Sequence, residues 1–310
     1  MKCGDVVDLV EKLIAESDRL RIHVKKIDRA YIIDTGIVTK TGLEVGKIIS
    51  EISMNNLSEV NIEIIHEKNI PMLQINITTD NPVTACLCSQ SATWALKCGE
   101  STCYISGPGK VLLRKPRKFF EKLESYVKDF EWKPIYIVEC IPPSEPSRDV
   151  IDKIMSNIQN DKIYIILTSS KSMSGMVQIC SRVIEVLLMR ILDNVNLDVV
   201  NSGIGTCIIP PVREDYITNI AACNDSIRYT GTVSILLNED TVEDVENILS
   251  RCVTSEDAKP FIELVKTYGS EFLLKAPIEM FSVSQVTVYG YGNVKIFGRR
   301  LIEKIITYFI

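Results

Sequence analysis

The sequence has few of the side chains that most metal and nucleophilic sites use. Its 310 residues include two histidines, His23 and His66, and neither lies in a motif. The ten cysteines are scattered without a C-x-x-C pair, whereas zinc and iron–sulfur sites need tighter clusters. These absences argue against a histidine-based triad and against a bound metal. We expect the cysteines to be reduced and mostly buried, as in a cytoplasmic protein.

Long apolar runs and an excess of positive charge are missing as well. No run approaches the roughly 20 residues needed to span a bilayer. The first residues pass directly into the amphipathic spacing of a helix over 6–14, without a signal peptide. The net charge of −5 argues against a general nucleic-acid binder, and the one short basic run, 114–118, suits a solvated turn. We therefore expect a soluble cytoplasmic protein with neither membrane nor nucleic acid as partner.

Strands followed by loops and helices predict an α/β fold with mixed sheets. A strand at 30–34, a Gly/Thr loop and a helix at 43–54 come first, and a strand from Tyr164, a Ser/Gly loop and a helix from Gly175 repeat this order. Tyr31 and Tyr164 each precede two isoleucines, and Gly42 and Gly175 each stand eleven positions later. Either the chain contains a weak internal duplication, or two generic strand–loop–helix units are alike by chance.

Three prolines within residues 141–146 break any regular element and mark a junction. We predict two similar α/β halves, an N-terminal domain of residues 1–143 and a C-terminal domain of residues 144–310, with 272–310 free to pack back on the first. A cleft between the two halves is the expected ligand site. The other predicted elements are helices at 148–158, 243–251 and 260–268, a hairpin of 285–289 with 294–297, and a short closing helix.

A polar stripe interrupts the helix that follows Gly175. Gln178, Arg182 and Glu185 stand at i, i+4 and i+7, so they share one face of a helix that is otherwise apolar. An Arg and a Glu three apart are usually an exposed ion pair worth about 0.2–0.5 kcal/mol. The apolar flanks favour burial instead, where charges need partners or a cleft. The alternatives are an exposed ion pair and a base held beside a fixed cation.

Two loops have features of known functional loops, one of an anion-binding loop and the other of a catalytic aspartate or phosphate loop. Small residues over 168–175 expose N–H groups at a helix N-terminus, where an anion is favoured, although an ordinary Ser-rich cap explains them too. The loop lacks the Gly-Lys-Ser/Thr ending of a Walker A motif. Asp34-Thr-Gly36 resembles an aspartic-protease loop or the first phosphate loop of an actin-like ATPase. The equivalent residues, 167–169, supply no second carboxylate, which argues against both.

Six blocks along nearly the whole chain carry a more specific resemblance. They are Asp34–Gly36 with Gly42–Glu51, Thr79–Pro82 with Ala85–Leu87 and Ser89-Gln90, Ser106–Pro108, Gly175–Glu185, Asn224-Asp225, and Lys259–Phe261. In order and spacing they are similar to the archaeal methenyltetrahydromethanopterin cyclohydrolase family. The resemblance implies a two-domain α/β subunit, usually a homotrimer, that binds a reduced pterin between its domains and works in the one-carbon chemistry of methanogenesis.

The resemblance also implies a reaction and a set of site residues. The reaction is reversible hydrolysis of 5,10-methenyl-tetrahydromethanopterin to its N5-formyl form, without metal, nucleotide or other cofactor. Its amidinium carbon is already electrophilic, so catalysis needs a positioned water and a base. The family's Arg and Glu fall on Arg182 and Glu185, with Glu185 as the base and Arg182 orienting it. The implied substrate-binding residues are Asp80, Asn81, Gln90, Ser91, Ser106, Gly107, Ser174, Gly175, Gln178, Asn224 and Asp225.

Two positions depart from the family pattern. A Lys often follows Ser-Gln where this chain has Ser91, and a Gly pair is common where it has Asn55 and Asn56. Loss of one such charge would cost on the order of 2–4 kcal/mol of transition-state stabilisation. Two alternatives to the cyclohydrolase follow: an impaired descendant that binds a pterin or a protein partner, and the same reaction on a folate-type carrier.

Overall fold

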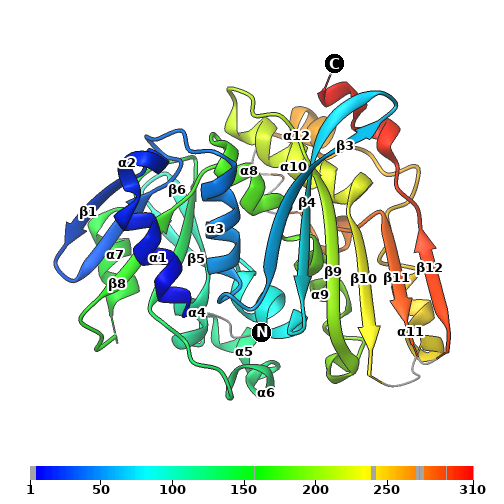
Figure 1. Cartoon of the computed structure of the whole chain (residues 1–310), viewed down its shortest axis with the longest axis horizontal. Coiled ribbons are helices and arrows are strands. Elements are labelled where there is room, and N and C mark those ends of the chain that lie inside the picture. The colour runs from blue at the N-terminus through cyan, green and yellow to red at the C-terminus, as the bar shows by residue number, and fades with distance from the viewer. Residues whose placement is uncertain are drawn as a thin grey trace. The chain divides into compact units, whose positions relative to one another are not determined.

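The structure, a computed structural model, describes residues 5–156, 158–238, 242–269, 272, 276–290 and 292–309. The chain forms two compact units (Figure 1): unit 1 holds Met1–Leu57 and Cys88–Gln178, and unit 2 holds Ser58–Leu87 and Ile179–Ile310. Each unit contains one six-stranded sheet with both parallel and antiparallel neighbours. The predicted α/β class with mixed sheets is therefore confirmed.

The sheet of unit 1 has parallel strands at its centre and antiparallel strands at its edges. All five residues of β8 are buried, as expected for an apolar run between two parallel neighbours. Alternate side chains face two cores: one core includes helix α7, and the other includes helices α1 and α3. In sheet order the strands are β1 (His23–Ile27), β2 (Ala30–Asp34), β8 (Ile163–Leu167), β7 (Ile135–Ile141), β6 (Ser101–Ser106) and β5 (Trp94–Cys98).

The two strands of the proposed duplication are direct neighbours in this sheet. β2 and β8 pair in parallel with Tyr31 opposite Tyr164, and the two ring centroids lie 5.7 Å apart. The helices that follow them also approach closely, because a Cβ on Gly46 of α3 (Leu43–Ser53) would lie 2.6 Å from Cβ of Val177 in α8 (Met173–Cys180). The matched segments therefore lie side by side in one unit. The predicted division at residue 143 assigns them to different domains.

The sheet of unit 2 is antiparallel except where β10 and β11 run in parallel. Helices α9 (Val183–Ile191) and α10 (Tyr216–Thr230) contact β9 and lie on one side of this sheet in Figure 1. In sheet order the strands are β12 (Val294–Gly298), β11 (Gln285–Tyr289), β10 (Thr232–Leu237), β9 (Val200–Ile209), β4 (Ile70–Thr79) and β3 (Glu59–Glu67).

Both sheets combine strands from the two halves of the sequence. β8 joins β2 and β7 in unit 1, while β3 and β4 join β9 in unit 2. The compact units therefore do not coincide with the predicted domains 1–143 and 144–310, because pairing over such separations leaves no local signal at the proline-rich junction. The C-terminal residues Leu301, Ile302, Ile305 and Tyr308 pack against Met72 of unit 2.

The remaining predicted elements are present within a few residues. The predicted helices correspond to α7 (Arg148–Met155), α11 (Val242–Leu249) and α12 (Phe261–Tyr268), and the closing helix is two short turns, η4 (Ile302–Lys304) and η5 (Ile306–Tyr308). β11 and β12 form the predicted hairpin, of which Tyr291 lies outside the described residues. The other elements are α1 (Val6–Ala15), α2 (Ser17–Leu20), η1 (Val83–Gln90), α4 (Pro108–Leu112), α5 (Arg117–Glu121), α6 (Glu124–Val127), η2 (Leu197–Val199) and η3 (Ile278–Met280).

Two cysteines correct the expectation of reduced thiols. Cys103 on β6 and Cys140 on β7 stand directly opposite each other in an antiparallel pair and form a disulfide. They are 37 residues apart in the chain, so only the strand pairing brings them together. Among the described residues, seven further cysteines lie outside any disulfide. Outside the gaps named above, the chain has no helix that is both long and apolar enough to cross a membrane.

Candidate functional site

The predicted polar stripe lies on two helices and the turn between them. α8 ends at Cys180, α9 begins at Val183, and the N–H of Arg182 donates to the carbonyl of Ile179, three residues back. Gln178 therefore lies on α8, where it is buried, while Arg182 and Glu185 stand at the start of α9. The prediction of one unbroken helix is wrong at this point, because the backbone of Arg182, with φ −82° and ψ 9°, has left the helical conformation.

Arg182 and Glu185 form a two-pronged ion pair. Nε of Arg182 donates to Oε2 of Glu185 at 2.6 Å, and Nη2 donates to Oε1 at 3.1 Å. The side chain of Glu185 is 7 % exposed and that of Arg182 is 24 % exposed, so the exposed-pair interpretation is wrong. A planar fork fixes the plane of the carboxylate as well as its charge. The geometry supplies an oriented carboxylate with one adjacent cation.

Glycines on β9 let this pair sit close to the sheet. A Cβ on Gly205 would lie 2.6 Å from Cγ1 of Val183 and 2.7 Å from Cγ1 of Ile184, the first two residues of α9. Such distances are too short for a side chain. Because glycine occupies this position, the first turn of α9 can rest directly on the strand.

The block around Asp80 borders the same part of β9. Oγ of Ser202 donates to Oδ1 of Asp80 at 2.7 Å, and the N–H of Asn81 donates to Oγ1 of Thr79 at 3.0 Å. A Cβ on Gly203 would lie 3.4 Å from Cβ of Pro82 and 3.7 Å from Cδ1 of Ile184. The Asp80–Pro82 turn and the start of α9 therefore share Gly203 as a neighbour within unit 2.

Asp225 is bonded to distant parts of its own unit. Its oxygens accept from the N–H groups of Phe261 at 2.5 Å and Ile262 at 3.1 Å, and from the hydroxyl of Tyr308 at 2.7 Å. It thus anchors the start of α12 and the C-terminal turn on α10. Asn224 donates to the carbonyl of Ile220. The substrate-binding roles of Asn224 and Asp225 stay predictions, and these bonds assign Asp225 a structural part.

The titration of Asp225 predicts a pH-dependent stability. Burial raises the pKa of Asp225 from its ordinary 3.8 to about 6, against the opposing bonds from Tyr308 and the backbone. The folded protein therefore holds this proton more tightly than the unfolded chain. The resulting stabilisation is complete below about pH 4, is lost as pH rises through about 6, and amounts to about 3 kcal/mol. Urea unfolding of Asp225→Asn across pH 4–7 should lack this slope, and equal slopes in both proteins would contradict the assignment.

In unit 1 the structure brings two predicted binding segments together. The N–H of Gly107 donates to the carbonyl of Ser89 at 2.8 Å, which ties the Ser106–Gly107 loop to the end of η1. Gln90 is the last residue of η1, and Ser91 follows it. Nζ of Lys110 donates to Oγ of Ser91 at 2.9 Å. The sequence interpretation missed Lys110 because its block ended at Pro108. The available signal was a lysine in the first turn of a helix that opens directly after a Ser-Gly-Pro turn.

Ser174 is bonded mainly to the loop that follows β2. Its Oγ donates to the carbonyl of Thr35 at 2.8 Å, accepts from Oγ1 of Thr41 at 2.7 Å, and lies 2.8 Å from Oγ of Ser172. These contacts favour a structural cap over an anion cradle, and the binding role of Ser174 stays a prediction. Asp34 likewise closes its own loop by accepting from the N–H groups of residues 36–39.

Gly175 should tolerate no side chain. A Cβ there would lie 2.0 Å from the carbonyl oxygen of Ser169, so Gly175→Ala must move the backbone and should destabilise the protein by about 1–3 kcal/mol. Gly42, its counterpart in the repeat, has nothing within 4 Å of the corresponding position. Gly42→Ala is the matched control, with an expected change within about 1 kcal/mol. Urea unfolding measures the stability of both variants. Equal losses of stability would contradict the close approach of Gly175 to the carbonyl of Ser169.

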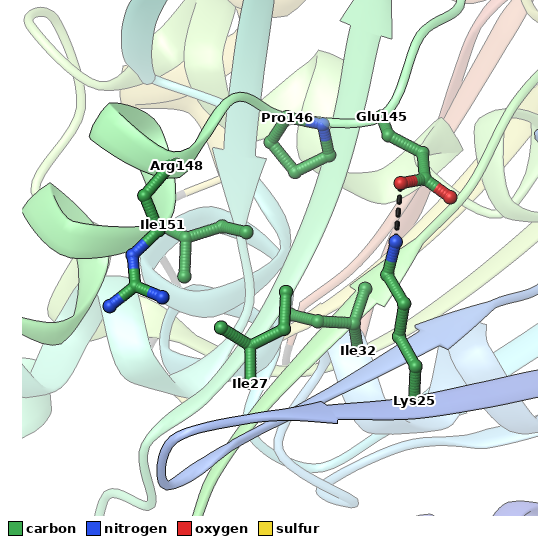
Figure 2. Close-up of a pocket in the computed structure, with 7 residues that line it drawn as sticks. All are labelled: Lys25, Ile27, Ile32, Glu145, Pro146, Arg148 and Ile151. Atoms are coloured by element: carbon green, nitrogen blue, oxygen red, sulfur yellow. Dashed lines mark hydrogen bonds and ion pairs between the residues drawn. The ribbon is translucent and has the colours of Figure 1, made fainter.

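A pocket lies elsewhere in unit 1. Figure 2 shows its apolar floor and the ion pair between Lys25 and Glu145, whose atoms are 2.5 Å apart. None of its lining residues is a predicted site residue; they are Lys25, Ile27, Ile32, Glu145, Pro146, Arg148 and Ile151. Within the part of the chain that the structure describes, no three His, Cys, Asp or Glu side chains gather so as to hold a metal ion.

Comparison with known proteins identifies relatives over most of the chain. Residues 4–307 match the family model described as Cyclohydrolase (MCH). A protein of Xanthobacter autotrophicus named methenyltetrahydromethanopterin cyclohydrolase is 31% identical over 291 residues, which cover 91% of this chain and 84% of that protein. Proteins of the same name from Methanocaldococcus jannaschii (26%, covering 94% and 92%) and Methanosarcina mazei (28%, covering 93% and 90%) are also similar.

Proposed function

Because the chain belongs to the cyclohydrolase (MCH) family, we propose that it catalyses the reversible hydrolysis of 5,10-methenyl-tetrahydromethanopterin to the N5-formyl form. The names of its relatives support this substrate. The observation that carries the proposal in this chain is the fork between Arg182 and Glu185, because it holds a carboxylate in one orientation with little exposure. A carboxylate fixed in this way suits a base that acts on a single positioned water.

In the proposed mechanism Glu185 transfers one proton from the attacking water to the leaving nitrogen. As the water oxygen bonds to the amidinium carbon, Glu185 accepts one of the water's protons. It then gives that proton to the ring nitrogen as the carbon–nitrogen bond opens, and the remaining hydroxyl proton leaves to give the formyl oxygen. Hydrolysis of the cationic methenyl form therefore releases one proton overall. Arg182 keeps Glu185 in the orientation that both transfers require.

The remaining site residues enter the proposal as substrate contacts. Asp80 and Asn81 belong to the turn whose Pro82 shares Gly203 as a neighbour with Ile184, at the start of α9 in unit 2. Gln90 and Ser91 lie with Ser106 and Gly107 in unit 1. The bonds already made by Ser174 and Asp225 give these two weaker support.

The absorbance of the methenyl substrate tests the proposal, because hydrolysis removes that chromophore. Purified protein should deplete methenyl-tetrahydromethanopterin rapidly, and methenyl-tetrahydrofolate should be run in parallel. Turnover of the folate alone would move the reaction to the folate-type carrier. Binding without turnover of either compound would favour the impaired descendant.

We also propose a homotrimer that works in the cytoplasm. The trimer follows from the family resemblance. The cysteines outside the disulfide suit a reducing compartment, although the Cys103–Cys140 bond counts against such a compartment. Light scattering should give a mass of three times the 34.9 kDa subunit. A mass of one or two subunits would contradict the trimer.

A further inference from the structure

Lys110 is a completely buried lysine whose contacts lead to the predicted binding segments. It lies in the first turn of α4 (Pro108–Leu112) with no exposed surface. Lysine is almost never fully buried without polar partners. Its Nζ donates to Oγ of Ser91 at 2.9 Å and to Oγ1 of Thr93 at 3.3 Å. Its position therefore depends on the chain that follows η1.

Aromatic rings hold the same ammonium from the α5 side. Nζ of Lys110 lies 5.1 Å from the ring centroid of Phe119 and 5.3 Å from that of Phe120. Both distances are within the range of a cation–π contact, which strengthens when water is excluded. The ammonium thus contacts two ring faces as well as two hydroxyls, so it links α5 to the segment of residues 91–93.

The backbone of α4 completes the connection. The N–H of Lys110 donates to the carbonyl of Gly107 at 3.2 Å, and the N–H of Gly107 donates to the carbonyl of Ser89 at 2.8 Å. Gly107 has φ +93°, a conformation that a side chain would strain. The side chain of Lys110 therefore reaches the residue after Gln90, and its backbone reaches the loop that carries Ser106.

We infer that Lys110 is a positioning residue, which fixes Gln90 and Ser91 relative to Ser106 and Gly107. The inference rests on the proposed function, because it is that function which makes these four residues substrate contacts. An ammonium can only donate, so Oγ of Ser91 accepts and its own hydrogen points away from Lys110. Ser91 is thereby presented as a donor, and it selects an electron-rich atom as its partner.

Lys110→Met tests the inference, since methionine keeps most of the apolar length and removes the donors. Amide hydrogen exchange over residues 89–93 and 101–109 should accelerate about tenfold, because both segments lose a shared anchor. KM for the methenyl substrate should rise about tenfold with a smaller change in kcat. Lys118→Met is the matched control, since Lys118 is exposed on α5 and should change neither exchange nor KM.

A second comparison distinguishes a positioning role of Lys110 from a general loss of protein stability. If Lys110 acts through Ser91, the double variant Ser91→Ala with Lys110→Met should have the KM of Ser91→Ala alone, because Lys110 then has no contact left to position; effects that multiply would overturn that route. Should Lys110→Met fail to fold, Ser91→Ala and Thr93→Val each remove one bond and must each accelerate exchange over 89–93. Unchanged exchange in these variants would overturn the positioning role of Lys110.

The exchange measurement does not depend on turnover. If the wild-type protein hydrolyses no pterin, the proposed function fails while exchange still decides whether Lys110 holds the two segments. If exchange accelerates in Lys110→Met but KM stays unchanged, the segments are held but do not contact substrate, which overturns the positioning role.

Discussion

Glu185→Gln should lower kcat by about 10²- to 10⁴-fold and leave KM nearly unchanged. The amide has the shape of the carboxylate but cannot take a proton from the attacking water or return one to the leaving nitrogen. Because this step occurs after binding, substrate affinity should survive. Loss of methenyl absorbance measures kcat, and quenching of intrinsic fluorescence by the bound pterin measures affinity.

Glu124→Gln supplies a matched control in the same chain. Glu124 accepts from Arg114 in the same fork, with Nε at 2.8 Å and Nη2 at 3.0 Å, but its side chain is 57 % exposed. An exposed pair contributes about 0–1 kcal/mol, so this variant should keep wild-type kcat. If Glu185→Gln behaves like Glu124→Gln, Glu185 is not the base.

The strands were predictable because each is a short apolar run with its own local signal. The predicted strands at 30–34 and from Tyr164 match β2 and β8, since aromatic and β-branched side chains suit a pleated, buried surface. The pairing of these strands was not predictable. Their register joins Tyr31 to Tyr164 across more than a hundred residues, and nothing near either tyrosine encodes the other. The division of the chain into two units depends on such long-range pairings, so it could not be predicted from the sequence either.

The site divides in the same way. Arg182 and Glu185 were predictable because both partners lie within one helical turn, so spacing alone brings them together. Ser174 and Asp225 were harder, because their partners are Thr35 and Thr41 for the one and Phe261 and Tyr308 for the other. Lys110 became recognisable only when folding placed its ammonium beside Ser91, 19 residues back in the chain.

Arg182→Met should cost about 3–5 kcal/mol of stability, since removing one partner leaves a buried charge uncompensated. It should also lower kcat by about 10²- to 10³-fold, because the carboxylate loses the donors that orient it. Urea unfolding and the absorbance assay measure the two effects. Arg114→Met leaves only the exposed carboxylate of Glu124 without its cation, so it should cost at most about 1 kcal/mol.

The double variant Arg182→Met with Glu185→Gln decides whether the pair acts as a buried unit. Once the carboxylate is neutral, the missing cation no longer leaves a charge unpaired, so the double variant should be more stable than Arg182→Met alone. The same cycle on Arg114 and Glu124 should give nearly additive changes, since water already solvates the carboxylate of Glu124. Additive changes at Arg182 and Glu185 too would mean that water solvates this pair as well. A solvated pair does not hold the carboxylate of Glu185 in one orientation, and the proposed role of Glu185 as the base depends on that orientation.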